Sequence, residues 1–195
     1  RDFPDRVNDP VNTTAGRAIE TARVMNWGFN HSPVLSANFH SGALVVNYPY
    51  DSDPNPFASY SATPDDSLFI AQSLAYASLN APMSASSWFS QGIVNGVEWY
   101  LVYGGMQDWN YYWMGCNDVT IELGNTKWPS ASQLPGLWDD NRDAMLAYMG
   151  WALRGVRGVV TDALTGQPLS ATVRVLGIDH DVFTDVDLHH GVDLS

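Results

Sequence analysis

Two residues able to do chemistry, His40 and Glu122, occur inside segments that are otherwise typical of β-strands. Residues 35–40, LSANFH, alternate apolar and polar side chains, as a strand with one buried face does. His40 falls on the polar face at the end of this strand, where α/β sheets gather their ligands. The pattern leaves two interpretations open, because His40 is either a structural residue or a ligand.

Glu122 lies within DVTIELG, where Val119, Ile121 and Leu123 form one face of a predicted strand and Glu122 lies on the other. A carboxylate in such an apolar strand is costly unless a partner or a function holds it. Burial raises the pKa of a glutamate, and a group of this kind is suited to general-base catalysis. A structural salt bridge is the alternative, and the pattern does not choose between the two.

Tyr100 precedes a third feature, the GGMQDW turn, and Gln107 belongs to it, within a region of strand-like pieces that glycines interrupt. A pair of glycines after a strand permits a mobile loop, and a tyrosine on such a loop can close over a ligand. The alternative is that Tyr100 is one more core aromatic residue in a chain with 8 Trp, 9 Tyr and 7 Phe. The other four histidines are expected to have ordinary surface roles.

The composition narrows the class of partner. The 195 residues carry 9 Lys and Arg against 21 Asp and Glu, a net charge of -12. This charge repels phosphate backbones, so we expect no nucleic-acid partner. It suits a cationic substrate, although an acidic surface that keeps the protein in solution is the simpler explanation. The single cysteine, Cys116, excludes an internal disulfide framework. No apolar run approaches the roughly 18 residues of a membrane span, so no transmembrane segment is expected.

Helices and strands alternate around these candidate residues, which predicts an α/β fold. The predicted helices cover residues 13–28, 63–79 and 132–154. The predicted strands cover residues 35–40, the continuous apolar run at 43–49, and residues 119–123. Thr63 is the expected N-cap of the second helix, while Gly28 and Gly155 are expected to end the first and the third.

The sequence pattern changes after Gly155. Residues 156–178 alternate valine with polar residues, turn at LTGQP and show no helical period. This is the expected start of a small β-sandwich. The predicted domains are therefore residues 1–154, an α/β unit, and residues 155–195, the beginning of a β unit.

Three segments in order, LSANFHSGALVVNYPYD, NGVEWYLVYGGMQDWNYYW and CNDVTIELG, resemble those of the zinc metallocarboxypeptidases. The resemblance is strongest to the branch that contains carboxypeptidases D, E, N and M, and it covers nearly the whole chain. It implies an α/β fold with a mixed β-sheet flanked by helices, whose N-terminal part is absent here. It also implies that residues 155–195 begin the all-β, transthyretin-like sandwich of that branch.

The resemblance implies a catalytic role for the first two candidates. His40, in NFHSG, matches the third zinc ligand of the family. Glu122, in TIELG, matches the glutamate that activates zinc-bound water and transfers its proton. The implied cofactor is Zn²⁺, and the implied reaction is metal-assisted hydrolysis of a peptide bond.

Five further residues match substrate-binding positions of the family. Arg1, in RDFPD, matches the arginine that binds the terminal carboxylate, a task suited to a guanidinium group. Tyr100 matches the mobile tyrosine that closes on the C-terminal end, and Ser41 lies in a substrate-lining position. Asp51 matches the acidic residue by which this branch selects Lys or Arg, and Gln107 matches its neighbour in the pocket. The implied partner is a peptide or protein with a free C-terminus, its last residue basic.

One element of the family pattern is missing. A catalytic zinc needs three protein ligands, and the family takes two from a His-x-x-Glu motif that this sequence does not contain. The chain also begins inside an NRNFPD-like motif without Met, so we expect a piece of a longer protein. The missing ligands are then expected upstream, and these residues alone are expected to be inactive.

Other interpretations remain at this stage. A non-catalytic homologue would bind peptide C-termini without cleaving them, and a structural or adhesive module would share the motifs by coincidence. An extracellular or periplasmic location is expected from the family. The sequon Asn12-Thr13-Thr14 agrees with that location, but such triplets are common.

Overall fold

A computed structural model describes residues 1–155 and 158–171 of the chain. Its centre is a four-stranded sheet in the order β1-β4-β2-β3. The strands are β1 (Leu35–His40), β2 (Ala43–Tyr48), β3 (Ile93–Asn95) and β4 (Asn117–Gly124). β4 pairs parallel to β1 and antiparallel to β2, while β2 pairs parallel to β3. The sheet is therefore mixed, and the α/β prediction with a mixed sheet is confirmed.

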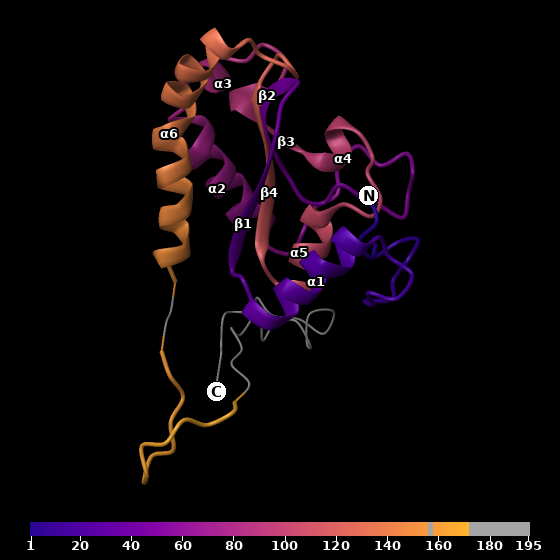
Figure 1. Cartoon of the computed structure of the whole chain (residues 1–195), viewed down its shortest axis with the longest axis vertical. Helices are drawn as coiled ribbons and strands as arrows, with labels where there is room; N and C mark the ends of the chain where they lie inside the picture. The colour runs from indigo at the N-terminus through magenta and orange to yellow at the C-terminus, as the bar shows by residue number, and fades with distance from the viewer. Residues whose placement is uncertain (156–157, 172–195) are drawn as a thin grey trace.

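Helices cover both faces of this sheet (Figure 1). α2 (Asp66–Ala77) and α6 (Leu134–Gly150) pack against each other on one side, and α1 (Ile19–His31), α4 (Gly96–Trp99) and α5 (Met106–Met114) lie on the other. The remaining helical turns are short: α3 (Ala81–Ser84) and three 3₁₀ turns at Ser90–Gly92, Ala131–Gln133 and Trp151–Leu153. Among the helices of the described residues, none is long and apolar enough to cross a membrane.

The two faces of the sheet differ in chemistry, because successive side chains of a strand point to opposite faces. On the side of α2 and α6, Val46, Val119 and Ile121 pack with Phe69 and Tyr76 in the main hydrophobic core. The opposite face carries polar residues from the two parallel strands: Ser36, Asn38 and His40 of β1, and Asp118, Thr120 and Glu122 of β4. The polar face is therefore the one that can bind ligands.

Two predicted helix starts are wrong. α1 begins at Ile19 and not near Thr13, because the Asp2 carboxylate accepts a hydrogen bond from the Ala18 N–H and so caps the helix. α2 begins at Asp66, and Thr63 is not its N-cap. The neighbouring Asp65 does not cap through its side chain either, because its carboxylate accepts a hydrogen bond from Tyr111 Oη at 2.8 Å.

The sequence predicts that Gly28 ends the first helix. In the structure Gly28 lies inside α1. A Cβ at this position would stand 3.3 Å from the Trp109 ring, so the glycine serves a close packing contact with α5. α5 itself is the element that the sequence analysis missed, since residues 106–114 form a helix in a region read as broken strand. The long third helix is confirmed in outline, and Gly155 follows it with φ +109°.

The predicted turn at LTGQP is present, closed by a bridge between Thr161 and Pro168. The rest of the predicted β unit, from residue 172 on, lies outside the described residues. The transthyretin-like domain and the domain boundary therefore remain predictions.

Candidate active site

The structure brings His40 and Glu122 together. They are register partners in the parallel pair of β1 and β4, so their side chains leave the same face at adjacent strand ends. Glu122 is only 8% exposed, and its Oε2 is buried without a hydrogen-bond partner in the part of the chain that the structure describes. Burial raises the pKa of Glu122, and the charges of His40 and Lys127 act in the opposite direction. A carboxyl group of this kind can take and release a proton.

The loops that follow β1 and β4 are tied together beside this pair. Ser41 Oγ donates a hydrogen bond to the Lys127 carbonyl at 3.1 Å, and the Gly42 N–H donates one to the Gly124 carbonyl at 2.7 Å. A side chain at Gly42, whose φ is +127°, would also meet the alkyl stem of Lys127 at 3.0 Å. Ser41 therefore fixes the Lys127 loop and brings a positive charge near Glu122, a contribution that the sequence analysis did not include.

A second polar cluster, here called the Asp51 cluster, consists of Asp51, Asn47 and Gln107. Asp51 is 6% exposed, and its Oδ1 accepts hydrogen bonds from Asn47 Nδ2 at 2.9 Å and Gln107 Nε2 at 3.1 Å. Both donors are neutral amides, and no lysine or arginine of the described residues forms an ion pair with Asp51. The carbonyl oxygens of the same two amides are buried and lack partners in this part of the chain. The cluster is thus rich in acceptors, and its carboxylate forms no ion pair within the part of the chain that the structure describes.

Glycines let the backbone approach the Asp51 carboxylate. A Cβ at Gly96 would stand 1.9 Å from Asp51 Oδ1, and one at Gly105 would stand 3.6 Å from Oδ2. The segment between them is bound to the same strand end, since the Val97 N–H donates to the Tyr50 carbonyl at 3.0 Å and the Val102 N–H donates to the Asp51 carbonyl at 2.8 Å. This segment crosses directly over Asp51, and no side chain larger than hydrogen fits at Gly96.

The carboxylate of Asp108, on α5, accepts hydrogen bonds from the backbone at Asp51 and Ser52. Its Oδ1 accepts the Asp51 N–H at 2.8 Å, and its Oδ2 accepts the Ser52 N–H at 3.0 Å and the Ser52 hydroxyl at 2.6 Å. Burial raises the pKa of Asp51 well above its usual range, and the nearby Asp108 charge raises it further. Burial likewise raises the pKa of Asp108. A cation placed beside Asp51 would offset the repulsion between these two buried carboxylates and lower the pKa of Asp51.

Arg1 and Tyr100 lie near the same cluster. Arg1 is exposed, its main-chain carbon lies 3.4 Å from the place a Gly104 Cβ would occupy, and its charge acts to lower the pKa of Asp51. Tyr100 is 48% exposed, and its ring packs edge-on against Trp99. It belongs to the segment that crosses Asp51. Because its ring is exposed, Tyr100 is not a core residue.

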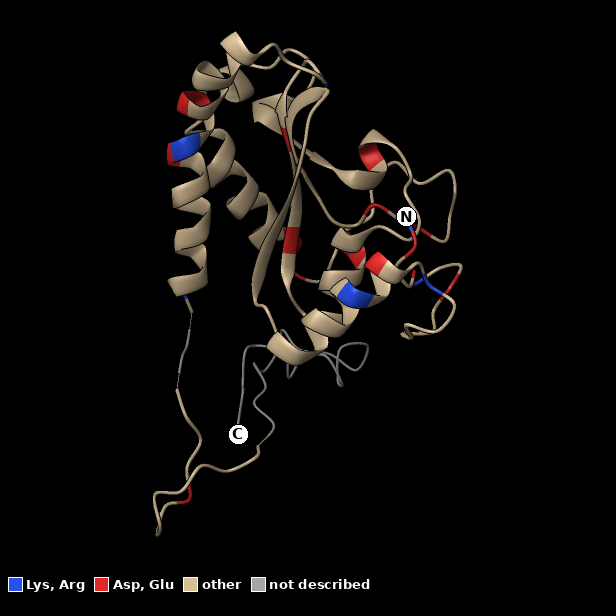
Figure 2. Cartoon of the chain, in the orientation of Figure 1, with Lys and Arg blue, Asp and Glu red and all other residues tan. Residues whose placement is uncertain are grey.

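The polar face of the sheet connects the His40–Glu122 pair with the Asp51 cluster. Asn47, which binds Asp51, is the register partner of Thr120, and Thr120 lies two residues before Glu122 on β4. With strands about 4.8 Å apart and a rise of about 3.4 Å per residue, the Cα atoms of Asn47 and Glu122 lie about 8 Å apart. Figure 2 shows several acidic residues on the side of the sheet that carries α4 and α5. All seven predicted site residues therefore lie near one face and its loops.

Sequence reasoning missed Asn47 and Asp108. Asn47 carried a usable signal, because it is a polar residue inside the apolar run ALVVNY, where a buried amide needs partners. Asp108 carried none, since an aspartate in a glycine-rich turn is ordinary. Its role arises only from contacts with residues 51 and 52.

The donor atoms of this site match part of what a catalytic zinc ion requires. His40 offers one exposed imidazole, and Glu122 offers a carboxyl oxygen without a partner beside it, which suits an acid–base group next to a metal. Within residues 1–155 and 158–171, no three potential ligands from His, Cys, Asp and Glu lie close enough to hold a metal ion. The residues fit one side of a zinc centre, and a complete centre needs further ligands.

A further buried carboxylate, that of Asp118, gives a test of this electrostatic picture. Its Oδ2 accepts hydrogen bonds from Asn38 and Asn110, and burial raises its pKa from 3.8 to about 6. The folded state therefore binds a proton more readily than the unfolded chain. The stability this contributes is complete below the unfolded pKa and is lost as the pH rises through about 6.

We expect this carboxyl to lower the free energy of unfolding by about 2 kcal/mol between pH 4 and pH 7. Asp118→Asn removes the titration, so its stability should decline less over the same interval. Urea unfolding at a series of pH values measures both slopes. Parallel slopes for the two proteins would show that Asp118 does not titrate in this range.

The sequence is similar to those of known carboxypeptidases. The sequence profile of the zinc carboxypeptidase family matches residues 1–144. Human carboxypeptidase D is 43% identical over 194 residues, covering 94% of this chain. Chicken (Gallus gallus) carboxypeptidase Z is 40% identical over 180 residues, 87% of the chain, and Caenorhabditis elegans carboxypeptidase E is 40% identical over 172 residues, 80% of the chain. The match spans only 14%, 28% and 36% of these three relatives, respectively.

Proposed function

Because the chain belongs to the zinc carboxypeptidase family, we propose that the whole protein is a zinc-dependent carboxypeptidase that removes a C-terminal Lys or Arg from peptides and proteins. One observation carries the catalytic part of this proposal. His40 and Glu122 lie side by side at the ends of two parallel strands, and the Glu122 carboxyl group has a buried oxygen without a partner among the described residues.

The proposed mechanism divides the chemistry between these two residues. Zinc, when bound, polarises the scissile carbonyl and makes the attacking water more acidic. His40 supplies one imidazole ligand. Glu122 accepts the proton of the attacking water on its unpartnered oxygen and delivers it to the leaving amine. The raised pKa of Glu122 favours both halves of this transfer, because it makes the group a stronger base and still lets it release the proton.

The preference for Lys or Arg is supported by Asp51. Its buried carboxylate has two neutral donors and no cationic partner within the described residues. A basic substrate side chain would neutralise this charge and supply donors to the free amide oxygens of Asn47 and Gln107. A neutral side chain would leave the carboxylate buried and unpaired, which is costly.

Arg1 and Tyr100 are proposed to bind the free α-carboxylate of the substrate. Arg1 is an exposed guanidinium with no hydrogen bond to any described residue, so its donors are available. Tyr100 presents an exposed ring from the segment that crosses Asp51. Ser41 is proposed to line the substrate path beside His40. A requirement for a free carboxylate restricts cleavage to the last residue.

Three further proposals concern the whole protein. The remaining zinc ligands belong to a part of the protein that precedes these 195 residues, so the 195 residues alone are inactive. Residues 155–195 begin a transthyretin-like domain. The protein acts in an extracellular or periplasmic compartment, as the resemblance implies.

The test of the proposed function is metal removal. The whole protein should release arginine from a dansylated peptide ending in Arg, and o-phenanthroline should abolish this activity, with added Zn²⁺ restoring it. The isomer of phenanthroline that cannot chelate is the control and should have no effect. Release that persists after complete zinc removal would disprove the proposal, and an inert zinc-loaded protein that still binds the peptide would indicate a non-catalytic homologue.

A further inference from the structure

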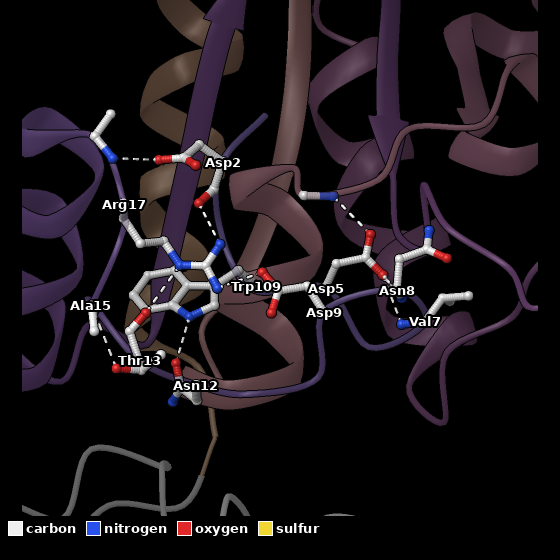
Figure 3. A network of polar contacts seen from close by, with 12 residues as sticks. Asp2, Asp5, Val7, Asn8, Asp9, Asn12, Thr13, Ala15, Arg17 and Trp109 are labelled. Atoms are coloured by element: carbon white, nitrogen blue, oxygen red, sulfur yellow. Dashed lines mark hydrogen bonds and ion pairs between the residues drawn. The ribbon is translucent and has the colours of Figure 1, made fainter.

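The N-terminal segment is organised around one buried guanidinium, that of Arg17 (Figure 3). Its side chain is 9% exposed. Nε donates to the Thr13 carbonyl at 3.0 Å, Nη1 to the Asp2 carbonyl at 2.7 Å and Nη2 to Asp9 Oδ2 at 2.6 Å. Three acceptors from three separate points of the N-terminal segment therefore converge on Arg17, and the backbone carbonyl of Asp2 is one of them.

The same segment is attached to the turn next to Asp51. The Phe3 N–H donates to the Gly104 carbonyl at 3.1 Å, and Asp5 Oδ2 accepts the Gly104 N–H at 2.9 Å. The Phe3 ring lies 5.1 Å from the Trp109 ring, and Trp109 Nε1 donates to Asn12 Oδ1 at 3.0 Å (Figure 3). The segment thus rests on α5 and on the turn before it.

Asp2 is the residue through which this unit places Arg1. Its carbonyl is bound by Arg17, and its carboxylate accepts the Ala18 N–H at 2.8 Å. Arg1 is the next residue back along the chain, and its own side chain makes no hydrogen bond with the described residues. Because Asp2 is bonded directly to Arg1, the way in which Asp2 is held sets the point from which Arg1 leaves the backbone.

We propose that Arg17 is a positioning residue for Arg1, holding the Asp2 carbonyl so that the Arg1 guanidinium stands beside Asp51 to receive a substrate carboxylate. This inference rests on the proposed function. Arg17 touches no substrate in this arrangement. Its loss should weaken recognition of the α-carboxylate and leave recognition of the basic side chain unchanged.

Two small molecules separate these two recognitions. L-arginine carries both the guanidinium and the α-carboxylate, whereas agmatine has the guanidinium and lacks the carboxylate. We expect the whole wild-type protein to bind arginine more tightly than agmatine, measured by calorimetry or by competitive inhibition. Arg17→Met should reduce the ratio of the two affinities about tenfold, since a small misplacement of a clamping residue has effects of this size or larger. Agmatine affinity should change less than about twofold.

Arg23 provides a matched control, because it is exposed on α1 and makes no hydrogen bond with the described residues. Arg23→Met removes the same charge as Arg17→Met but breaks no hydrogen bond. Its affinity ratio should equal that of the wild type. Arg17→Lys keeps the charge but not the planar set of donors, so it should lower the ratio by an intermediate amount. This variant also gives the test a folded protein if Arg17→Met does not fold.

The ratio of the arginine affinity to the agmatine affinity decides whether Arg17 positions Arg1. A selective loss of arginine affinity supports the inference. An unchanged ratio in both Arg17 variants overturns it, as does an equal loss for arginine and agmatine, which would indicate a general structural role. If the wild type binds neither molecule, the proposed basic specificity fails and the inference fails with it.

Discussion

Glu122→Gln is expected to lower kcat of the whole protein on the order of a thousandfold, with a much smaller change in KM. The substitution keeps the size and polarity of the side chain but removes the group that accepts a proton. Gln has no place for the proton of the attacking water, and it cannot return one to the leaving amine. Because His40 and the Asp51 cluster are untouched, the substrate should still bind. Initial rates on a peptide ending in Arg give both constants.

Glu98→Gln is the control for this substitution, since Glu98 is exposed on α4 and makes no hydrogen bond with the described residues. It should leave kcat and KM unchanged. The Glu122 variant should also show a native circular dichroism spectrum, because the carboxylate has few partners to lose. Activity retained by a folded Glu122→Gln protein would assign the proton transfer to another residue.

The placement of His40 and of Glu122 on the polar face of their strands follows from sequence more directly than any other part of the site. Both strands alternate apolar and polar residues, and a register slip of one residue would bury the wrong face. The pattern therefore placed both residues on a polar face before the partner strands were known. Which strands are neighbours did not follow from the pattern, because β1 and β4 are separated by more than 70 residues, as the pairing of His40 with Glu122 shows.

The Asp51 cluster was predictable only in part. The resemblance pointed to Asp51 and Gln107, but the role of Asp108 depends on hydrogen bonds across 56 and 57 positions of sequence. α5 was missed for a related reason. MQDWNYYWM has four aromatic residues and an adjacent glycine pair, a composition that favours strand and turn, and only burial of Trp109 and Tyr111 against the rest of the fold makes it a helix.

The start of α1 shows the same limit. Thr13 and Thr14 are acceptable N-cap residues by local rules, yet Asp2 caps the helix from outside it. Local sequence cannot reveal a cap supplied by a different segment. This contact also links helix formation to the placement of Arg1, so the residues that set the helix start are the ones proposed to set the carboxylate site.

Asp51→Asn is expected to reverse the preference for a basic C-terminal residue. For a peptide ending in Arg, kcat/KM should fall about a hundredfold or more, the usual effect of removing one partner of a buried charge pair. For a peptide ending in citrulline, which has the shape of arginine without its charge, kcat/KM should stay level or rise, because no unpaired carboxylate then remains in the pocket. The ratio of the two constants is the measured quantity.

Asp53→Asn is the matched control, the same change two residues further along the chain. The Asp53 carboxylate accepts hydrogen bonds from Ser61 Oγ at 2.6 Å and from the Asn55 N–H at 2.8 Å, and not from the amides of Asn47 and Gln107 that bind Asp51. Its Arg-to-citrulline ratio should therefore match that of the wild type. The sheet geometry also predicts that Asp51→Asn leaves the catalytic step intact, because Asn47 and Glu122 are about 8 Å apart on one face and do not share partners. A variant that loses activity equally on both peptides would therefore place Asp51 in the catalytic machinery, and an unchanged ratio would move the basic specificity to another carboxylate.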